Sequence, residues 1–401
     1  MRIAILSDFH LGYERFSEDA FTQAQSAMAQ AMEQADAILL AGDLFDTKLP
    51  RPEVLSQAFS IFRLPLAKKW EARIESFSAK DGRAQLCGAP VIAIHGTHEM
   101  RVKSMVNPIQ LLASAGFLVN AHSATVVLGK GGERAAITGM GGVPERQAKG
   151  AIEALDPKPV PGACNIFVFH QTLSELIPAA EGAMSAEDLP GGFDLYVSGH
   201  LHAHSDTNVS GKRILIPGST VITQLRKEEA KEKGFYIFDT ATKKSEFVGI
   251  ETREFIFREL SLSSAKPEDA IGMMRREIES ALSLAKRGKP VIRLKVSGTL
   301  SGPAQLDTSV LEKAFSGRAF LAIDQSFASS SLRQKIDQLR GARQGAASLL
   351  EMENEMLFAR LRQKGVEPTS ELQEMIALLS SGRHVPPDEA IKKLLPPKGP
   401  Q

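Results

Sequence analysis

Cysteine is scarce in this 401-residue chain, which contains only Cys87 and Cys164. The two residues show neither a metal-type spacing nor a secretory context, which favours a reducing, cytoplasmic setting. Long apolar runs are absent as well, because none approaches the ~18 residues that a membrane span needs. Only five apolar residues precede Ser7, too few for the core of a signal peptide. We therefore expect a cytoplasmic protein with no membrane partner.

An excess of charge of one sign is also missing. The 48 Lys and Arg residues are balanced by 47 Asp and Glu residues, which gives a formal net charge of +1. This balance excludes a chain-wide positive field for nucleic acid, so any basic surface must be local. Charged residues make up 24% and hydrophobic residues 43%, as in a typical globular protein. The length exceeds one ordinary domain, and we expect two or three.

Short apolar runs, each ending in polar residues, are the main pattern of the first 250 residues. Continuous runs of this length are typical of strands buried on both faces. Helix-like stretches at 17–35, 52–63 and 107–115 lie between some of them, and this alternation predicts an α/β fold. In such sheets, functional groups gather at the carboxyl ends of the strands. The runs occupy residues 3–6, 37–42, 91–94, 166–169, 193–199 and 213–218.

The pattern changes near residue 253. An apolar helical stripe at 266–288 is followed by an alternating, strand-like stretch at 290–298, which predicts a small α+β domain. Beyond a Ser-rich linker, Leu, Met and Ile recur at helical spacing and predict a helical tail. We expect three parts, with limits at 1–252, 253–326 and 327–401.

Six polar elements stand at the ends of the apolar runs. Carboxylates together with imidazoles suit manganese, iron or zinc, and one carboxylate can bridge two ions about 3.5–4 Å apart. Each element alone is a weak signal, but the ordered set indicates a two-metal site that activates water and holds a phosphate oxygen. The elements are Asp8-x-His10, Gly42-Asp43, Gly96-Thr97-His98-Glu99, His170, Gly199-His200-Leu201-His202 and Ser219-Thr220.

This order resembles the calcineurin-like metallophosphoesterase family, with its pattern D-x-H, G-D, G-N-H-[DE], H and G-H-x-H, over about residues 1–225. Within that family the chain looks most like the SbcD-type nucleases of DNA double-strand-break repair, the prokaryotic counterparts of the meiotic-recombination-eleven nuclease. The resemblance implies a β-sandwich core flanked by helices, a capping domain for DNA recognition and a helical tail. The stretches that carry it are SDFHLG, AGDLFDTKLPRP, FHQT, SGHLHAH, IPGST, KGFYIFD and KPVIRLKVSG.

The resemblance also implies a role for each motif residue. His98 would be the catalytic histidine, acting on the transition state or the leaving oxygen, and Glu99 would orient it. Asp46 would touch the nucleotide or hold its own loop. The implied metal ligands are Asp8, His10 and His202 for one ion, Asp43 as the bridge, and His170, His200 and the residue at position 97 for the other.

Thr97 departs from the family pattern, in which an asparagine oxygen coordinates the second ion. The threonine hydroxyl is shorter in reach by roughly one bond, ~1.5 Å, so we expect a weaker second site that is not abolished. His95 stands two residues earlier, on the same side if the strand continues. One hypothesis is that His95 supplies the missing ligand or supports it from behind. The alternative is a histidine bonded to a nearby backbone group.

The resemblance implies a manganese-dependent DNA phosphodiesterase with 3′→5′ exonuclease activity on duplex ends and endonuclease activity on single strands. It further implies a homodimer built from the helices near 53–63 and 107–115, and an SMC-like ATPase partner of the SbcC type that the tail would grip. Two alternatives stay open: a metallophosphoesterase acting on small phosphodiesters or phosphoproteins, and a non-catalytic DNA-end scaffold inactivated at Thr97. Candidates for a phosphate-facing patch, or for a merely solvated face, are Lys68, Lys69, Arg101 and Lys103.

Overall fold

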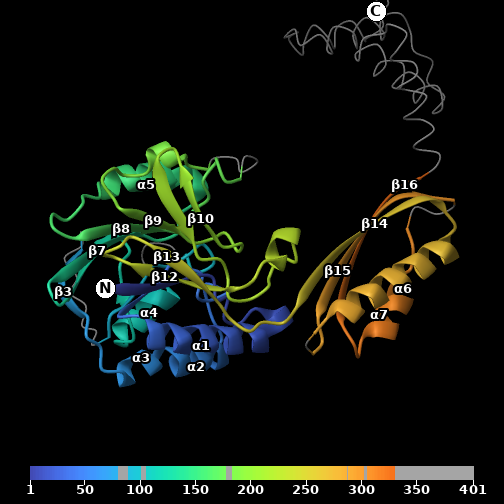
Figure 1. Ribbon diagram of the computed structural model, residues 1–401, viewed down its shortest axis with the longest axis horizontal. Helices are drawn as coiled ribbons and strands as arrows, with labels where there is room; N and C mark the ends of the chain where they lie inside the picture. Colours follow the sequence, from blue (N-terminus) through green and yellow to red (C-terminus); the bar gives the residue numbers. More distant parts are fainter. Residues whose placement is uncertain (80–88, 101–104, 178–182, 287, 302–304, 330–401) are drawn as a thin grey trace, which may run out of the picture. The chain divides into compact units, whose positions relative to one another are not determined.

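The computed structural model describes residues 1–79, 89–100, 105–177, 183–286, 288–301 and 305–329. Cys87, Arg101, Lys103 and nearly all of the predicted helical tail lie outside these residues. The chain forms two compact units (Figure 1), and the first contains the whole predicted site. Among the described residues, the first unit comprises Met1–Leu260, Met273–Lys295 and Thr308–Asp324, and the second comprises Ser261–Gly272, Val296–Asp307 and the residues from Gln325 to Ser329.

A six-stranded sheet forms one layer of the first unit, in the order β13-β12-β1-β2-β4-β5. Its neighbours β1, β2, β4 and β5 are parallel, whereas β12 and β13 run antiparallel. The apolar runs at 3–6, 37–42 and 91–94 supply its centre, as predicted. The strands are β1 (Arg2–Leu6), β2 (Ala37–Leu40), β4 (Val91–Ala93), β5 (Val119–Asn120), β12 (Gly234–Asp239) and β13 (Ser245–Gly249).

A seven-stranded sheet forms the other layer, in the order β10-β11-β9-β8-β7-β6-β3. Parallel pairing joins β7, β8, β9 and β11, and antiparallel pairing adds the outer strands. The runs at 166–169, 193–199 and 213–218 become β8, β9 and β11. The strands are β3 (Arg73–Ala79), β6 (Ala124–Lys130), β7 (Glu133–Met140), β8 (Cys164–Phe169), β9 (Leu195–Ser198), β10 (Ser205–Val209) and β11 (Lys212–Ile216).

The two sheets pack face to face through apolar side chains that alternate along their strands. Ile3 and Ile5 from β1 share one buried cluster with Ile166 and Val168 from β8. Burying both faces of a strand explains the continuous apolar runs, because neither face meets water. The predicted α/β sandwich is therefore confirmed.

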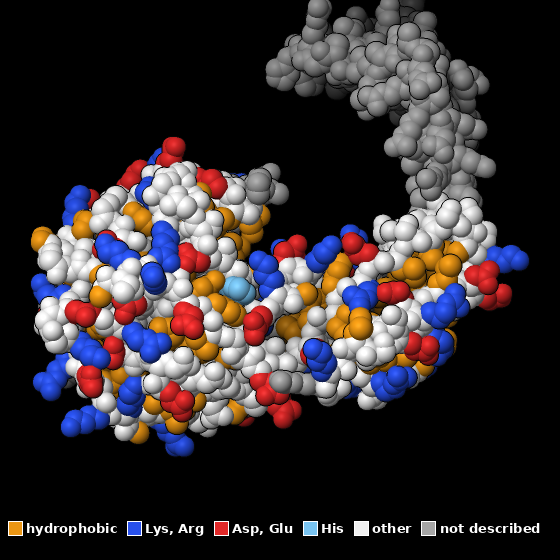
Figure 2. Space-filling view, viewed as in Figure 1, with side chains coloured by type: hydrophobic (Ala, Val, Ile, Leu, Met, Phe, Trp, Pro, Cys, Tyr) orange, Lys and Arg blue, Asp and Glu red, His pale blue; other side chains and the backbone are white. Residues whose placement is uncertain are grey.

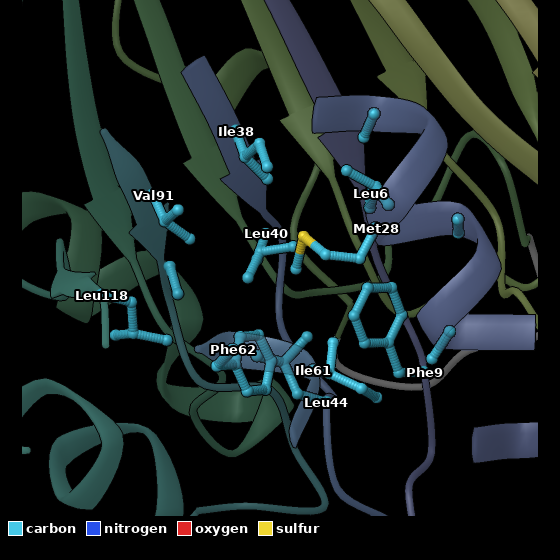
Figure 3. Packing of buried hydrophobic residues seen from close by; sticks show 14 of the residues in the cluster. Leu6, Phe9, Met28, Ile38, Leu40, Leu44, Ile61, Phe62, Val91 and Leu118 are labelled. Atoms are coloured by element: carbon cyan, nitrogen blue, oxygen red, sulfur yellow. The ribbon is translucent and has the colours of Figure 1, made fainter. Parts of the chain in front are cut away.

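Helices cover the outer faces of the sandwich. On the six-stranded sheet, α1 (Ser17–Gln34), α2 (Pro52–Phe62) and α4 (Pro108–Ser114) confirm the three predicted helices. Figure 3 shows Met28 of α1 and Phe62 of α2 packed with Leu40 of β2. On the opposite side, α5 (Ala148–Leu155) covers the seven-stranded sheet. The short α3 (Leu64–Ala67) follows α2. The 3-10 turns in the described part of the chain are η1 (Glu14–Phe16), η2 (Glu145–Gln147), η3 (Ala186–Asp188) and η4 (Lys227–Ala230).

Three strands after residue 254 form a separate sheet in the order β14-β15-β16. They are β14 (Phe255–Ala265), β15 (Val291–Leu300) and β16 (Phe320–Ser329), accompanied by α6 (Pro267–Leu284) and α7 (Ser309–Phe315). The helix predicted within 266–288 and the strand predicted at 290–298 are thus present. The three domain limits remain a prediction.

The near-equal numbers of basic and acidic residues in the sequence are reflected on the surface of the molecule. On the face shown in Figure 2, basic and acidic side chains are interspersed. The ammonium group of Lys68, one candidate for a phosphate-facing patch, donates to the carbonyl oxygens of Met32 and Ala35 at the end of α1. Cations stabilise a helix C-terminus in this way. Within the described residues, we find no helix that combines the length and the apolarity of a membrane span.

Candidate metal centre

Strained backbone marks the loops that carry the predicted site. Asp8, His10, Asp43 and His200 have φ values of 55°, 48°, 49° and 84°, a region that non-glycine residues seldom adopt. Such residues persist only where the surrounding structure holds them, and they cluster at functional sites. Gly42 has φ 96°, and a Cβ there would lie 2.5 Å from Nδ1 of His170, so glycine is required for the close approach.

The first group of convergent side chains is Asp8, His10 and His202, from the loops after β1 and β9. The Nε2 atoms of the two histidines are 3.2 Å apart, and each lies 3.8 Å from Oδ1 of Asp8. This carboxylate oxygen is buried and has no hydrogen-bond partner among the described residues. An orphaned buried acceptor facing imidazole nitrogens is costly unless a cation joins them, so the donor set fits a divalent ion.

The second group is Asp43, His170 and His200, from the loops after β2, β8 and β9. Nε2 of His170 lies 3.0 Å from Oδ2 of Asp43, and its Nδ1 donates to the carbonyl oxygen of Ala41 at 2.6 Å. The same Nε2 lies 4.0 Å from Oδ1 of Asp8. The two groups therefore adjoin, as a pair of neighbouring ions requires.

Burial and charge shift the pKa values of these residues in opposite directions. Burial opposes the charge of His170, but Asp43 outweighs it and raises the His170 pKa to about 10. Burial likewise opposes ionisation of Asp43, yet His170 holds the Asp43 pKa well below its usual range. Burial raises the pKa of Asp8 to about 6 and lowers that of His200 to about 3. Metal binding requires neutral imidazoles and ionised carboxylates. His200 is therefore already in the form that binds metal, whereas His170 must first release a proton.

Thr97 places its hydroxyl at the edge of the second group. Its Oγ1 lies 3.4 Å from Oδ2 of Asp43 and 3.5 Å from Nδ1 of His200. Ligands about 2.1 Å from a common ion are separated by about 3.0–3.4 Å, so these contacts are close to ligand spacing. The hydroxyl is thus near enough to join the site, although the expected weakening of that site stays a prediction.

His98 lies at the rim of the centre. Its ring is 45% exposed, and its Nδ1 lies 2.8 Å from the carbonyl oxygen of Asp46 and 3.6 Å from that residue's Oδ1. Asp46 Oδ1 also lies 3.1 Å from Nδ1 of His10. Asp46 therefore connects the predicted catalytic histidine with a predicted metal ligand.

Glu99 contacts backbone groups of the loops around the centre, and its predicted role in orienting His98 stays a prediction. Its two carboxylate oxygens accept the backbone N–H groups of Phe45, at 2.9 Å, and Gly96, at 2.8 Å. Burial, reinforced by the charge of Asp43, raises the Glu99 pKa to about 8. Glu99 braces the loops on either side of the centre, and it is Asp46 that contacts the His98 ring.

His95 belongs to neither group. Strand β4 ends at Ala93, so the strand alternation that would have aligned His95 with Thr97 does not continue. Nε2 of His95 lies 3.2 Å from the carbonyl oxygen of Gly142. A carbonyl oxygen can only accept, so Nε2 is the donor in this hydrogen bond. Burial lowers the pKa of this histidine to about 3. These contacts favour the backbone-bonded alternative.

Three contacts of the centre escaped the sequence analysis. Nδ1 of His202 lies 2.7 Å from Oγ1 of Thr223 and 3.3 Å from Oε1 of Glu229 in η4. Lys233 in turn contacts Glu229 at 3.4 Å. Burial opposes ionisation of Glu229, but His202 and Lys233 lower its pKa to about 2. The run KEEAKEK resembles a solvated charged segment, so no sequence signal distinguishes Glu229 from its exposed neighbour Glu228.

Comparison with known proteins extends these observations. Residues 1–204 match the calcineurin-like phosphoesterase family. The chain is 30% identical over 259 residues to the double-strand break repair protein MRE11 of Encephalitozoon cuniculi, covering 59% of this chain and 45% of that protein. It is 27% identical over 312 residues to mre-11 of Caenorhabditis elegans, covering 67% and 42%. For Mre11 of Archaeoglobus fulgidus the identity is 26% over 332 residues, covering 74% and 69%. The chain thus spans less than half the length of the first two relatives.

Proposed function

Since the chain belongs to the calcineurin-like phosphoesterase family, we propose that it is a two-metal DNA nuclease of double-strand-break repair. One observation carries the proposal. Oδ1 of Asp8 is buried without a hydrogen-bond partner in the described part of the chain, and it faces Nε2 of His10, His170 and His202 at 3.8, 4.0 and 3.8 Å. This arrangement supports metal chemistry, and the names of the relatives support DNA repair as its context.

The proposed ions are manganese, with Asp8, His10 and His202 holding one, and His170, His200 and Thr97 holding the other. Asp43 is the proposed bridge between them. When bound, such ions supply activated water and neutralise charge on a phosphate group. Mixed carboxylate and imidazole donors are compatible with manganese.

His98 is the proposed catalytic residue. Its exposed ring can meet a substrate, while its Nδ1 is fixed by Asp46 at 2.8 Å. With Nδ1 occupied, Nε2 is the ring nitrogen left to act on the leaving oxygen of the nucleotide, as a general acid does. Its backbone N–H donates to Oδ1 of Asp43 at 2.9 Å, which ties its position to the proposed bridge.

The proposed substrates and activities are duplex ends for a 3′→5′ exonuclease and single strands for an endonuclease. The proposed assembly is a homodimer through α2 and α4, and the 40% exposed Leu111 of α4 is compatible with an apolar contact there. Standard interfaces of this kind bury apolar anchors at their centre.

An SMC-like ATPase is the proposed partner of the tail. The apolar stripes of residues 329–395 support this, because short isolated helices are marginal in water and need a surface. Truncation after Phe327 is expected to leave a metal-binding nuclease that no longer binds the ATPase. Undiminished binding by the truncated chain would exclude the docking role.

One assay distinguishes this proposal from the two alternative functions, a small-molecule phosphoesterase and a non-catalytic scaffold. The protein is incubated with labelled duplex DNA, single-stranded DNA and a generic aryl phosphodiester in Mn²⁺. Cleavage of both DNAs supports the nuclease. Hydrolysis of the aryl ester alone would indicate a small-molecule phosphoesterase, and metal binding without hydrolysis of any substrate would indicate a scaffold.

A further inference from the structure

The imidazole of His202 makes contacts on two opposite sides. Its Nε2 faces Nε2 of His10 at 3.2 Å and Oδ1 of Asp8 at 3.8 Å. Its Nδ1 faces Oγ1 of Thr223 at 2.7 Å and Oε1 of Glu229 at 3.3 Å. The residues behind Nδ1 come from the segment between β11 and β12, which carries none of the predicted ligands.

The hydrogen-bond partners behind His202 favour a proton on one of its two ring nitrogens. Glu229 accepts the backbone N–H groups of Thr223, at 3.2 Å, and Gln224, at 2.7 Å, as an ionised carboxylate does. The single hydroxyl proton of Thr223 is directed to the same carboxylate, whose Oε1 is 3.5 Å away. Thr223 Oγ1 can then accept from Nδ1 of His202 at 2.7 Å, and the same Nδ1 also faces the acceptor-only carboxylate of Glu229 at 3.3 Å. Both contacts favour a proton on Nδ1. Nε2 is left with its lone pair facing Asp8.

Lys233 completes this arrangement. It is as deeply buried as Glu229, at 3% exposure for each side chain, and an isolated buried carboxylate would be very costly. Its ammonium group contacts Oε1 of Glu229 at 3.4 Å and donates to the carbonyl oxygen of His202 at 3.0 Å and to Oγ1 of Ser219 at 2.8 Å. The backbone of Ser219 forms an isolated parallel β-bridge with that of Ser7, the residue before Asp8. Lys233 thus links the carboxylate to the backbone of the His202 loop and to the hydroxyl of Ser219.

We propose that Glu229 is a positioning residue of the metal centre, which fixes the tautomer and the ring orientation of His202, while Lys233 keeps Glu229 in place. The inference rests on the proposed function only in that this centre binds metal. Partners behind a metal-binding histidine commonly contribute 10- to 100-fold to metal affinity. Loss of Glu229 should therefore weaken the Asp8, His10 and His202 site and leave the other site much less affected.

Calorimetric titration with Mn²⁺ tests the proposal on the full chain. Glu229→Gln keeps the size of the side chain and removes its charge, and we expect about 10- to 100-fold weaker binding at one of two sites. Glu228→Gln is the matched control, because that neighbour is exposed, and it should bind as the wild type does. Asp19→Asn controls for lost stability, since it breaks the Asp19–Arg253 pair without altering the centre.

A spectroscopic readout without metal separates positioning from a general structural role. In ¹⁵N-labelled protein with EDTA, His202 should be the Nδ1–H tautomer, and Glu229→Gln should mix the two tautomers. Thr223→Val provides an independent variant if Glu229→Gln does not fold, and Thr223→Ser should restore the wild-type tautomer and affinity.

The outcomes are distinct. If the wild type binds two manganese ions, and Glu229→Gln and Thr223→Val keep the wild-type affinity and tautomer, the positioning role is overturned. The proposed function then still stands. Lowered thermal stability in EDTA, as in Asp19→Asn, with unchanged affinity would overturn the positioning role as well. A wild-type chain that binds no manganese would overturn the proposed function together with this inference.

Discussion

Nε2 of His170 lies 3.0 Å from Oδ2 of Asp43, and both side chains are buried, although one follows β8 of the seven-stranded sheet and the other follows β2 of the six-stranded sheet. Because Nδ1 of the same ring donates to the carbonyl oxygen of Ala41, the metal-free imidazole is held doubly protonated beside an ionised carboxylate. A metal ion that takes this Nε2 must displace its proton. We therefore expect the pair to stabilise the metal-free fold and, if the proposed ions bind, to give up this proton and become ligands.

This pair gives metal-free stability a pH dependence. The pKa of His170 rises from an ordinary 6.5 to about 10 on folding. Its contribution is therefore fully present below pH 6.5 and is lost as the pH rises towards 10. We expect the unfolding free energy of His170→Asn, from urea denaturation in EDTA, to fall less steeply between pH 6.5 and 9 than that of the wild type.

His204→Asn is the control for this measurement. Burial lowers the pKa of His204, so its titration lies below the window in question. It should therefore follow the wild-type slope. Equal slopes for the wild type and His170→Asn would contradict the ion pair.

Removal of the proposed bridge should affect both ions. We expect Asp43→Ala to lower the amount of manganese bound at both sites. DNA cleavage should fall by more than about 100-fold, the largest loss usual for a residue that only supports a ligand. Bound metal is measured by elemental analysis after gel filtration. Asp206→Ala removes a carboxylate that pairs with Arg213 outside the centre and should keep both properties. Cleavage within tenfold of wild type in Asp43→Ala would rule out the two-metal assignment.

His98 should affect turnover and leave metal binding intact. In His98→Ala we expect about 10²- to 10⁴-fold lower kcat, the usual contribution of a general acid, with two ions still bound. The side chain lies at the exposed rim and contacts Asp46, which supports a role towards the substrate. A loss of metal in parallel with the loss of rate would make His98 a ligand.

Thr97 offers a graded test of the second site. Thr97→Val removes the hydroxyl that lies 3.5 Å from Nδ1 of His200 and should weaken one manganese site. Thr97→Asn introduces a longer amide oxygen and should tighten that site by about 10-fold, or about 1.4 kcal/mol. Calorimetry on both variants compares the two affinities. Weaker binding in Thr97→Asn would show that the loop is adapted to threonine.

The convergence of the candidate site residues could be predicted because they follow buried strands. Asp8, Asp43, His170 and His200 come directly after apolar runs, and the carboxyl ends of parallel strands converge in space. The fold class followed from the same runs. The hairpin of β6 and β7 was not predicted, although Gly131 and Gly132 with positive φ supply its turn signal.

Side-chain direction could not be derived from sequence. Glu99 is adjacent to His98 along the chain, yet its carboxylate turns inward to the backbone of Phe45 and Gly96. Strand β3 has a half-exposed pattern without an apolar run, so it has no strong strand signal. Glu229 and Lys233 become recognisable only when the fold buries them behind His202.

The most direct test of the two-metal nuclease is cleavage of end-labelled duplex and single-stranded DNA by the purified chain in Mn²⁺, Mg²⁺ or EDTA, with Asp43→Ala assayed in parallel. The account predicts products from both DNAs in Mn²⁺, fewer in Mg²⁺ and none in EDTA or with Asp43→Ala. Cleavage that persists in EDTA or in Asp43→Ala, or intact DNA in Mn²⁺ from a protein carrying two bound ions, would contradict it.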